Sequence, residues 1–168
     1  MAISHALQPL LLLLLALFFL PAALGLGTFV NFTNCRVSYP YRRVNVTSIW
    51  IDPYPLPLRE INRIKITAET NYNITLGKMI LNTFSVPLVL NPVHDEFHLC
   101  RDHTVTTCPV TAVPMVINIP VVINGADHYV REYFAEILLI EELINQTMCV
   151  TFRYLVRDPE FSTGILAA

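Results

Sequence analysis

The stretch Met148-Cys-Val-Thr-Phe-Arg-Tyr-Leu-Val156 decides the fold class of this chain. Every second residue from Met148 to Val156 is a sizeable apolar side chain, whereas Thr151 and Arg153 lie on the opposite side of an extended backbone. A period of two residues is typical of a β-strand with one dry and one wet face. We therefore expect a half-buried strand here.

The same alternation recurs in four segments upstream. Its apolar phases are Val44, Val46 and Trp50; Ile64, Ile66 and Ala68; Met79 and Leu81; and Val113, Met115, Ile117 and Ile119. Turn sequences such as Asn91-Pro92 and Asn124-Gly125 separate the runs,. Pro87, Pro114 and Pro120 suit edge strands or bulges, because proline cannot donate a ladder hydrogen bond. About seven short strands in one domain predict an all-β protein, a β-sandwich of antiparallel sheets.

Residues 129–144 fit two patterns. Tyr133, Ile137 and Ile140 share a helical spacing, but Tyr133, Ala135, Ile137 and Leu139 also form one phase of a strand,. Sequence alone leaves both open. A hairpin that turns at Glu142–Gln146 would place Asn145 at an exposed tip, as a second hairpin would place Asn73, and this favours the strand.

The N-terminus differs in composition from the rest. The chain has 168 residues, 54% of them hydrophobic, yet residues 1–25 contain no charged side chain. The apolar run Leu10–Leu20 is too short to span a bilayer and is followed by Ala23-Leu24-Gly25, a small-x-small cleavage sequence,. We expect a signal peptide over 1–25, with an uncleaved anchor as the alternative. The folded domain should cover 26–157, and 158–168 should form a flexible tail.

Glycosylation motifs and cysteines also indicate the secretory pathway. Four sequons begin at Asn31, Asn45, Asn73 and Asn145, and the cysteine count of four is even,. The mature protein is therefore expected outside the cell or in a vacuolar or endolysosomal lumen. The formal net charge of −2, with no Lys/Arg-rich run, argues against nucleic acid as a partner,.

Cys100 and Cys108 are close enough in sequence to staple a surface loop, which leaves Cys35 to pair with Cys149. Four cysteines allow three connectivities, so spacing does not settle the pairing. A zinc site is the alternative, but no Cys-x-x-Cys occurs, and we expect no metal.

No sequence pattern nominates an enzyme. His94-Asp-Glu-Phe-His98 lacks the Glu that follows the first His in zinc proteases, and Pro92 argues against a long helix, so a solvated loop is expected,. His103 and Asp102 nearby could bind metal only adventitiously. There is no Gly-x-Ser-x-Gly nucleophile elbow and no Gly-rich phosphate loop,. These absences favour a binding module without a cofactor.

Four sequence pieces then carry a family resemblance. They are Ile51-Asp-Pro-Tyr-Pro55, Leu76-Gly-Lys-Met-Ile-Leu81, the pair Leu99-Cys100 and Cys108-Pro-Val110, and Thr147-Met-Cys-Val-Thr-Phe152. In this order they resemble the ML (lipid-recognition) domain family, especially its plant-type phosphatidylglycerol/phosphatidylinositol transfer proteins. The cholesterol-transfer protein of Niemann-Pick type C disease is a more distant member.

The resemblance implies an immunoglobulin-like β-sandwich whose two sheets hold a phospholipid or sterol in an apolar cavity. It implies the disulfides Cys35–Cys149 and Cys100–Cys108. The extra early disulfide of the cholesterol-binding branch is absent, and Asn124-Gly-Ala-Asp-His128 replaces the Pro-Pro-Gly turn of plant-type members. The inward phase of the strands supplies the candidate cavity residues: Val46, Trp50, Ile64, Ile66, Met79, Leu81, Met115, Ile117, Tyr133, Ile137, Phe152 and Tyr154.

Two functions follow from these features. The first is a secreted or lumenal lipid carrier that needs no covalent step and touches membranes transiently. Arg63, Lys65 and Lys78 could meet an anionic head group, although solvated strand faces explain them as well. The second is an adhesion or co-receptor module with a dry core. An exposed apolar patch at Tyr54–Leu58 would favour this module or a membrane-docking role.

Overall fold

The computed structural model describes residues 26–35, 43–86, 93–102, 104–105, 108–110, 114–124, 131–141 and 145–157. Within these ranges the chain is all-β, and none of the described segments is helical. No helix in this part of the chain is therefore long and apolar enough to cross a membrane. The predicted signal peptide at 1–25, the predicted tail at 158–168 and His103 lie outside the described residues.

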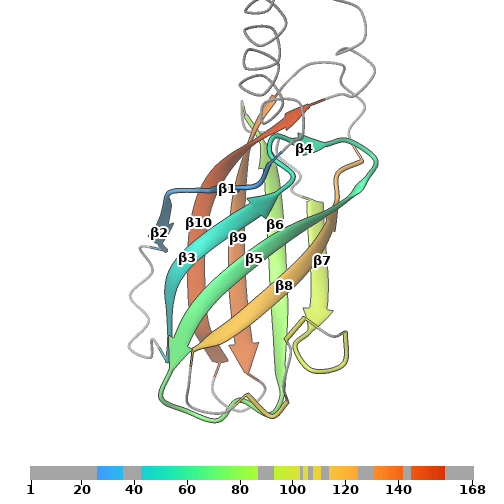
Figure 1. Cartoon of the computed structure of the whole chain (residues 1–168). Coiled ribbons are helices and arrows are strands. Elements are labelled where there is room, and N and C mark those ends of the chain that lie inside the picture. Colours follow the sequence, from blue (N-terminus) through green and yellow to red (C-terminus); the bar gives the residue numbers. More distant parts are fainter. Residues whose placement is uncertain are drawn as a thin grey trace, which may run out of the picture.

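Two sheets pack face to face as a β-sandwich (Figure 1). Sheet A has the order β1-β3-β5-β8, and sheet B has the order β2-β10-β9-β6-β7 with β4 beside β10. The strands of sheet A are β1 Thr28–Phe29, β3 Val44–Asp52, β5 Ile61–Thr70 and β8 Met115–Val122. Those of sheet B are β2 Phe32–Asn34, β4 Leu56–Pro57, β6 Gly77–Ser85, β7 Val93–His98, β9 Arg131–Glu141 and β10 Asn145–Arg157.

All pairings are antiparallel except the short parallel contact between β4 and β10. The predicted all-β class and its two antiparallel sheets are confirmed. Pro120 lies in β8, an edge strand of sheet A, as its missing N–H requires,. Within the ambiguous segment, the described residues 131–141 form a strand, since β9 pairs along its whole length with β10.

The connection from β5 to β6 differs from the hairpin that the sequence predicts. The predicted hairpin tip at Asn73 is wrong, because β5 belongs to sheet A and β6 to sheet B. Asn73 instead lies exposed in the link that passes from one sheet to the other. The N-terminal strap, residues 28–34, makes a similar crossing, with β1 on sheet A and β2 on sheet B (Figure 1).

A β-bulge in β3 changes which residues face the core. The register with β5 shifts between Val46 and Ser48, so Ile49 and Ile51 are buried on the inner face. The prediction that Trp50 points inward is wrong for this reason. Trp50 lies on the outer face of sheet A, where its ring meets Phe29 edge-on with centroids 4.7 Å apart.

Two further expectations about the surface are corrected. The segment His94–His98 is not a loop but most of the edge strand β7. The segment Tyr54–Leu58 is not an exposed patch, because Leu56 and Leu58 are buried and β4 pairs with the end of β10. Its apolar residues close one end of the core.

Two disulfides join the described strands and loops. Cys35, directly after β2, is bonded to Cys149 in β10, and Cys100 is bonded to Cys108. This is the pairing that the family resemblance implies. The loop closed by the second disulfide also reaches sheet A, because Val105 bridges Ile117 of β8. The outer edges of β7 and β8 therefore lie on the same side of the sandwich, with this loop between them.

Candidate functional site

The candidate site is the interior between the two sheets. Ten of the twelve candidate cavity residues are buried there: Val46, Ile64, Ile66, Met79, Leu81, Met115, Ile117, Ile137, Phe152 and Tyr154. Tyr133 is partly buried and packs against this core, and Trp50 lies outside it. Whether these residues line a lipid cavity remains a prediction.

Sequence alternation missed several residues of the interior. The candidate set does not include Ile49, Ile51, Thr83, Leu139 and Val150, yet all five are buried. The bulge in β3 gives no sequence signal, which explains the first two. Leu139 and Val150 follow directly from the alternation of β9 and β10.

The interior is aliphatic over most of its length and contains three flexible side chains. Met79, Met115 and Met148 are all buried, and they are every methionine of the chain except the first residue. Methionine is unbranched and adapts to irregular shapes. These three side chains can therefore change conformation within the core more easily than branched ones can.

Aromatic and polar side chains occupy one end of the interior. The Tyr133 and Tyr154 rings are stacked, with centroids 5.8 Å apart, and Phe152 lies 6.0 Å from Tyr154. The Tyr154 hydroxyl is buried and makes no hydrogen bond of good geometry. Burial raises the pKa of Tyr154 well above its ordinary value, the nearby Thr83 hydroxyl opposes this shift, and Tyr133 and Asp95 add to it.

A pocket lies under the N-terminal strap and shares Phe152 with the aromatic end of the interior. This pocket has a volume of about 520 Å³. Its lining comes from the strap, from Tyr54 and from β9 and β10: Thr28, Phe29, Val30, Asn31, Phe32, Thr33, Tyr54, Phe134, Thr151, Phe152 and Arg153. It is an aromatic groove that is open to solvent.

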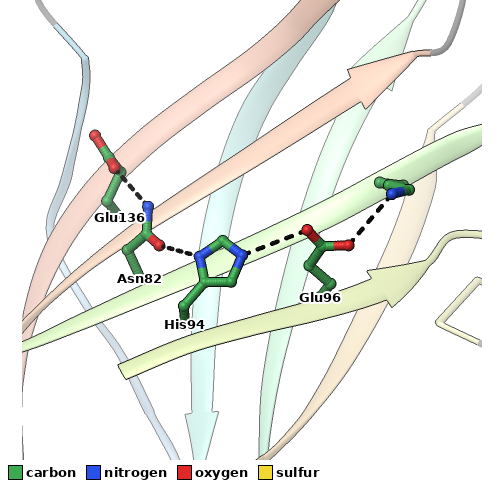
Figure 2. Close-up of polar contacts among 5 residues, drawn as sticks. Asn82, His94, Glu96 and Glu136 are labelled. Carbon is green, nitrogen blue, oxygen red and sulfur yellow. Dashed lines mark hydrogen bonds and ion pairs between the residues drawn. The ribbon is translucent and has the colours of Figure 1, made fainter. Parts of the chain in front are cut away.

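The outer face of sheet B carries a continuous chain of polar contacts (Figure 2). Asn82 donates to Glu136 over 2.9 Å and contacts the His94 ring through its carbonyl oxygen at 2.8 Å. The other His94 nitrogen lies 3.4 Å from Glu96, which also pairs with Lys78 at 3.3 Å. Hydrogen bonding from His94, followed by Lys78, lowers the pKa of Glu96.

The described residues with metal-ligating side chains are not arranged to bind a metal ion. Within the described segments, a single cluster of ligand-type atoms occurs, formed by Cys35, Glu136 and Cys149. Its two sulfurs are joined in a disulfide, so neither is available as a thiolate ligand,. Asp102 instead accepts the His98 backbone N–H at 2.6 Å, which lowers the pKa of Asp102.

The predicted head-group contacts lie on solvated faces. Arg63 and Lys65 are exposed on the outer face of β5, and Lys78 lies on the outer face of β6 beside Glu96. Three of the sequon asparagines, Asn31, Asn45 and Asn73, are exposed. Asn145 begins β10 at the hairpin with β9, and its side chain lies outside the described set.

Comparison with known proteins assigns the family. The chain is 32% identical over 154 residues to the MD-2-related lipid-recognition protein ROSY1 of Arabidopsis thaliana, and the match covers 90% of each chain. The chain belongs to the MD-2-related lipid-recognition (ML) family. No general family model matches the chain.

A solved structure supports the fold of this ML protein. A Niemann-Pick type C2 protein from the Japanese carpenter ant superimposes with a TM-score of 0.54 at 15% sequence identity. The match covers 76% of this chain and 99% of the ant protein. The expected immunoglobulin-like sandwich is confirmed by this likeness.

Proposed function

We propose that this ML protein binds one lipid between its two sheets and carries it through an aqueous compartment. The observation that carries the proposal is the 32% identity, over nearly the whole chain, to a protein named for lipid recognition. The buried and largely aliphatic inner faces of both sheets support it, because a lipid tail needs apolar walls on both sides,.

Binding of this kind is driven by burial of hydrocarbon. Each methylene transferred from water contributes about 0.8 kcal/mol, so burial of about ten methylenes supplies the roughly 8 kcal/mol of micromolar affinity. The three buried methionines and the aliphatic residues of β5 and β8 supply the surface. No bond is made or broken, so the protein acts as a carrier and not as an enzyme.

The covalent features of the chain support the expected compartment. Two disulfides require an oxidising environment, and exposed Asn31, Asn45 and Asn73 are accessible to glycosylation,. Together with the apolar N-terminus, these features support secretion or delivery to a vacuolar or endolysosomal lumen.

Transfer requires contact with a membrane, and the outer face of sheet A is suited to it. We call the residues Phe29, Trp50, Ile61, Arg63, Lys65 and Val122 the docking face. Registers place Phe29 beside Trp50, Trp50 beside Lys65, and Ile61 beside Val122. Exposed fractions of 68% for Phe29 and 75% for Ile61 leave apolar surface next to two cations. Such a face fits an anionic lipid surface.

The test is native mass spectrometry of the protein secreted from a eukaryotic host. After deglycosylation we expect a mass with two disulfides plus one lipid, and the lipid should vanish on organic extraction and identify its class. A bare polypeptide, even after incubation with phospholipid and sterol vesicles, would contradict lipid binding and favour the adhesion module.

A further inference from the structure

Tyr154 carries a polar atom into the interior that is poorly satisfied there. The Tyr154 side chain is 1% exposed, and its hydroxyl makes no hydrogen bond of good geometry. Buried hydroxyls nearly always have a partner, because desolvation without one is unfavourable. An apolar core would be more stable with phenylalanine at this position. The hydroxyl therefore points to a ligand group that it can bind.

Among the described residues, the polar groups that act on this hydroxyl come from Thr83, Tyr133 and Asp95, and none of them is a cation. Thr83 lies on the inner face of β6, and its hydroxyl lies close enough to Tyr154 to lower the pKa of the phenol by hydrogen bonding, although the contact falls short of good hydrogen-bond geometry. Asp95 projects toward the same side, because it pairs with buried Leu81 while His94 and Glu96 on either side meet on the outer face. Asp95 is only half-buried and disfavours negative charge at Tyr154.

The rest of the interior leads away from this end as hydrocarbon. Next to Asp95 in the register come Leu81, Ile137 and Val150, and one row further lie Met79 and Leu139. All five of these side chains are buried. An amphiphile can therefore lie along the strands with its polar end at Tyr154 and its apolar body among the aliphatic residues.

We infer that the Tyr154 hydroxyl, with Thr83 and Asp95 around it, binds the hydroxyl group of a neutral lipid held between the sheets. The inference rests on the proposed lipid binding and specifies its ligand. A hydroxyl both accepts and donates, so it suits a phenol on one side and a carboxylate on the other. A phosphate or carboxylate would meet the negative charge of Asp95 without a compensating cation among the described neighbours.

Two matched series of lipids test the inference. The first comprises cholesterol, 5-cholestene without the hydroxyl, and cholesterol sulfate; the second comprises dioleoylglycerol, its deoxy analogue dioleoyl-propanediol, and dioleoyl phosphatidic acid. In one series at least, the wild type should bind the hydroxyl lipid about tenfold more tightly than both other members, the effect of one buried hydrogen bond. The series that discriminates identifies a sterol or a glycerolipid.

Tyr154→Phe removes only the hydroxyl and is the decisive variant. It should bind the hydroxyl lipid about tenfold more weakly and the deoxy lipid as well as the wild type does. Its melting temperature without lipid should be equal or higher, because an unpartnered polar atom has been removed. Tyr72→Phe, at an exposed tyrosine, is the matched control and should change neither property.

The outcomes separate the inference from the proposed function. Equal binding of hydroxyl and deoxy lipids by the wild type, or unchanged hydroxyl binding by Tyr154→Phe, overturns the inference and leaves lipid binding intact. Failure of the wild type to bind any of the six probes contradicts lipid binding itself. If Tyr154→Phe does not fold, the Tyr154 hydroxyl has a structural role, and the decision passes to Thr83→Val. A folded Thr83→Val that keeps the wild-type preference for the hydroxyl lipid then overturns the inference, and one that loses this preference supports it.

Discussion

Glu141 carries a carboxyl group into a poorly hydrated position at the end of β9. Glu141 is 8% exposed, and one of its carboxylate oxygens is buried without a hydrogen-bond partner. Burial raises the pKa of Glu141, although Arg43 and Thr147 partly oppose the shift. Because the folded state holds the proton more tightly than the unfolded state, the ionised form of Glu141 destabilises the fold at neutral pH.

Glu141→Gln should therefore stabilise the protein at pH 7, by about 1 kcal/mol, the order of one unsatisfied buried group. The gain should shrink as the pH falls through the raised pKa of the folded state and disappear below the ordinary pKa of glutamate. Urea unfolding at pH 7 and pH 4 measures both values. Glu69→Gln, at an exposed position of β5, is the control. A loss of stability at pH 7 in Glu141→Gln would show that Arg43 outweighs burial.

Gly27 is the residue against which the single tryptophan rests. A Cβ atom built at Gly27 would lie 2.5 to 2.6 Å from three atoms of the Trp50 indole, closer than real carbon contacts. Gly27→Ala should displace the ring from Phe29 and red-shift Trp50 fluorescence, with a stability loss of about 1 kcal/mol. Fluorescence spectra of the folded variant measure the shift, and an unchanged spectrum would contradict the close packing.

At the scale of one element, the edge strand β7 is held partly by its outer-face charges. His94 and then Lys78 lower the pKa of Glu96, so ionised Glu96 stabilises the folded state,. This contribution is present above the ordinary pKa of glutamate and is lost as the pH falls through the lowered value. His94→Ala should raise the Glu96 midpoint toward the ordinary value in a carbon-detected NMR titration. Lys78→Met should raise it less, and the reverse order would contradict the leading role of His94.

The two disulfides should differ in how much they stabilise the fold. Cys35 and Cys149 are 114 residues apart in sequence, whereas Cys100 and Cys108 are 8 apart. In the chain-entropy account the long loop contributes about 4–5 kcal/mol and the short loop about 2–3. Urea unfolding of the two double serine variants should therefore show the larger loss for Cys35→Ser with Cys149→Ser. Equal losses would indicate that strain or residual unfolded structure dominates.

Strands were predictable wherever alternation was regular, as from Met148 to Val156, because inner and outer side chains meet different solvents. The bulge in β3 was not predictable, because it depends on how β3 pairs with β5 and leaves no signal in the amino-acid composition. The prediction for Trp50 was wrong for this reason. The passage from β5 to β6 was also missed, since a turn at Asn73 reads the same whether the next strand joins the same sheet or the facing one.

The candidate site was predictable as a set of inward apolar positions but not as a polar arrangement. The sequence placed Tyr154 among the cavity candidates, and the structure buries it. That Thr83 and Asp95 lie near its hydroxyl depends on the order β10-β9-β6-β7, which brings distant segments together. Asp95 was read as part of a solvated loop, because the strand character of β7 is hidden by its charged residues.

On the scale of the whole molecule, the two outer faces arrange their charged side chains differently. Sheet B carries Glu96, Glu132 and Glu136, each within hydrogen-bond distance of a basic or amide group. The docking face of sheet A instead places Arg63 and Lys65 next to exposed apolar side chains, with Asp52 the acid beside Arg63. A carrier with one face of this kind can approach an anionic bilayer in a preferred orientation.

Replacing both cations of the docking face should weaken membrane contact without disturbing the interior. Each basic side chain near an anionic surface contributes about 1 kcal/mol, so Arg63→Gln with Lys65→Gln should reduce binding to phosphatidylcholine vesicles containing 30% phosphatidylglycerol by roughly 30-fold. Vesicle co-sedimentation at low salt measures this, and the wild-type affinity should fall as salt is added. Lys78→Gln, on the outer face of sheet B, is the matched control and should bind nearly as well as the wild type. If the double variant and the control bind vesicles equally well, contact is made through another face. In a separate measurement, equal retention of bound lipid in the wild type and both variants would show that the interior is unchanged.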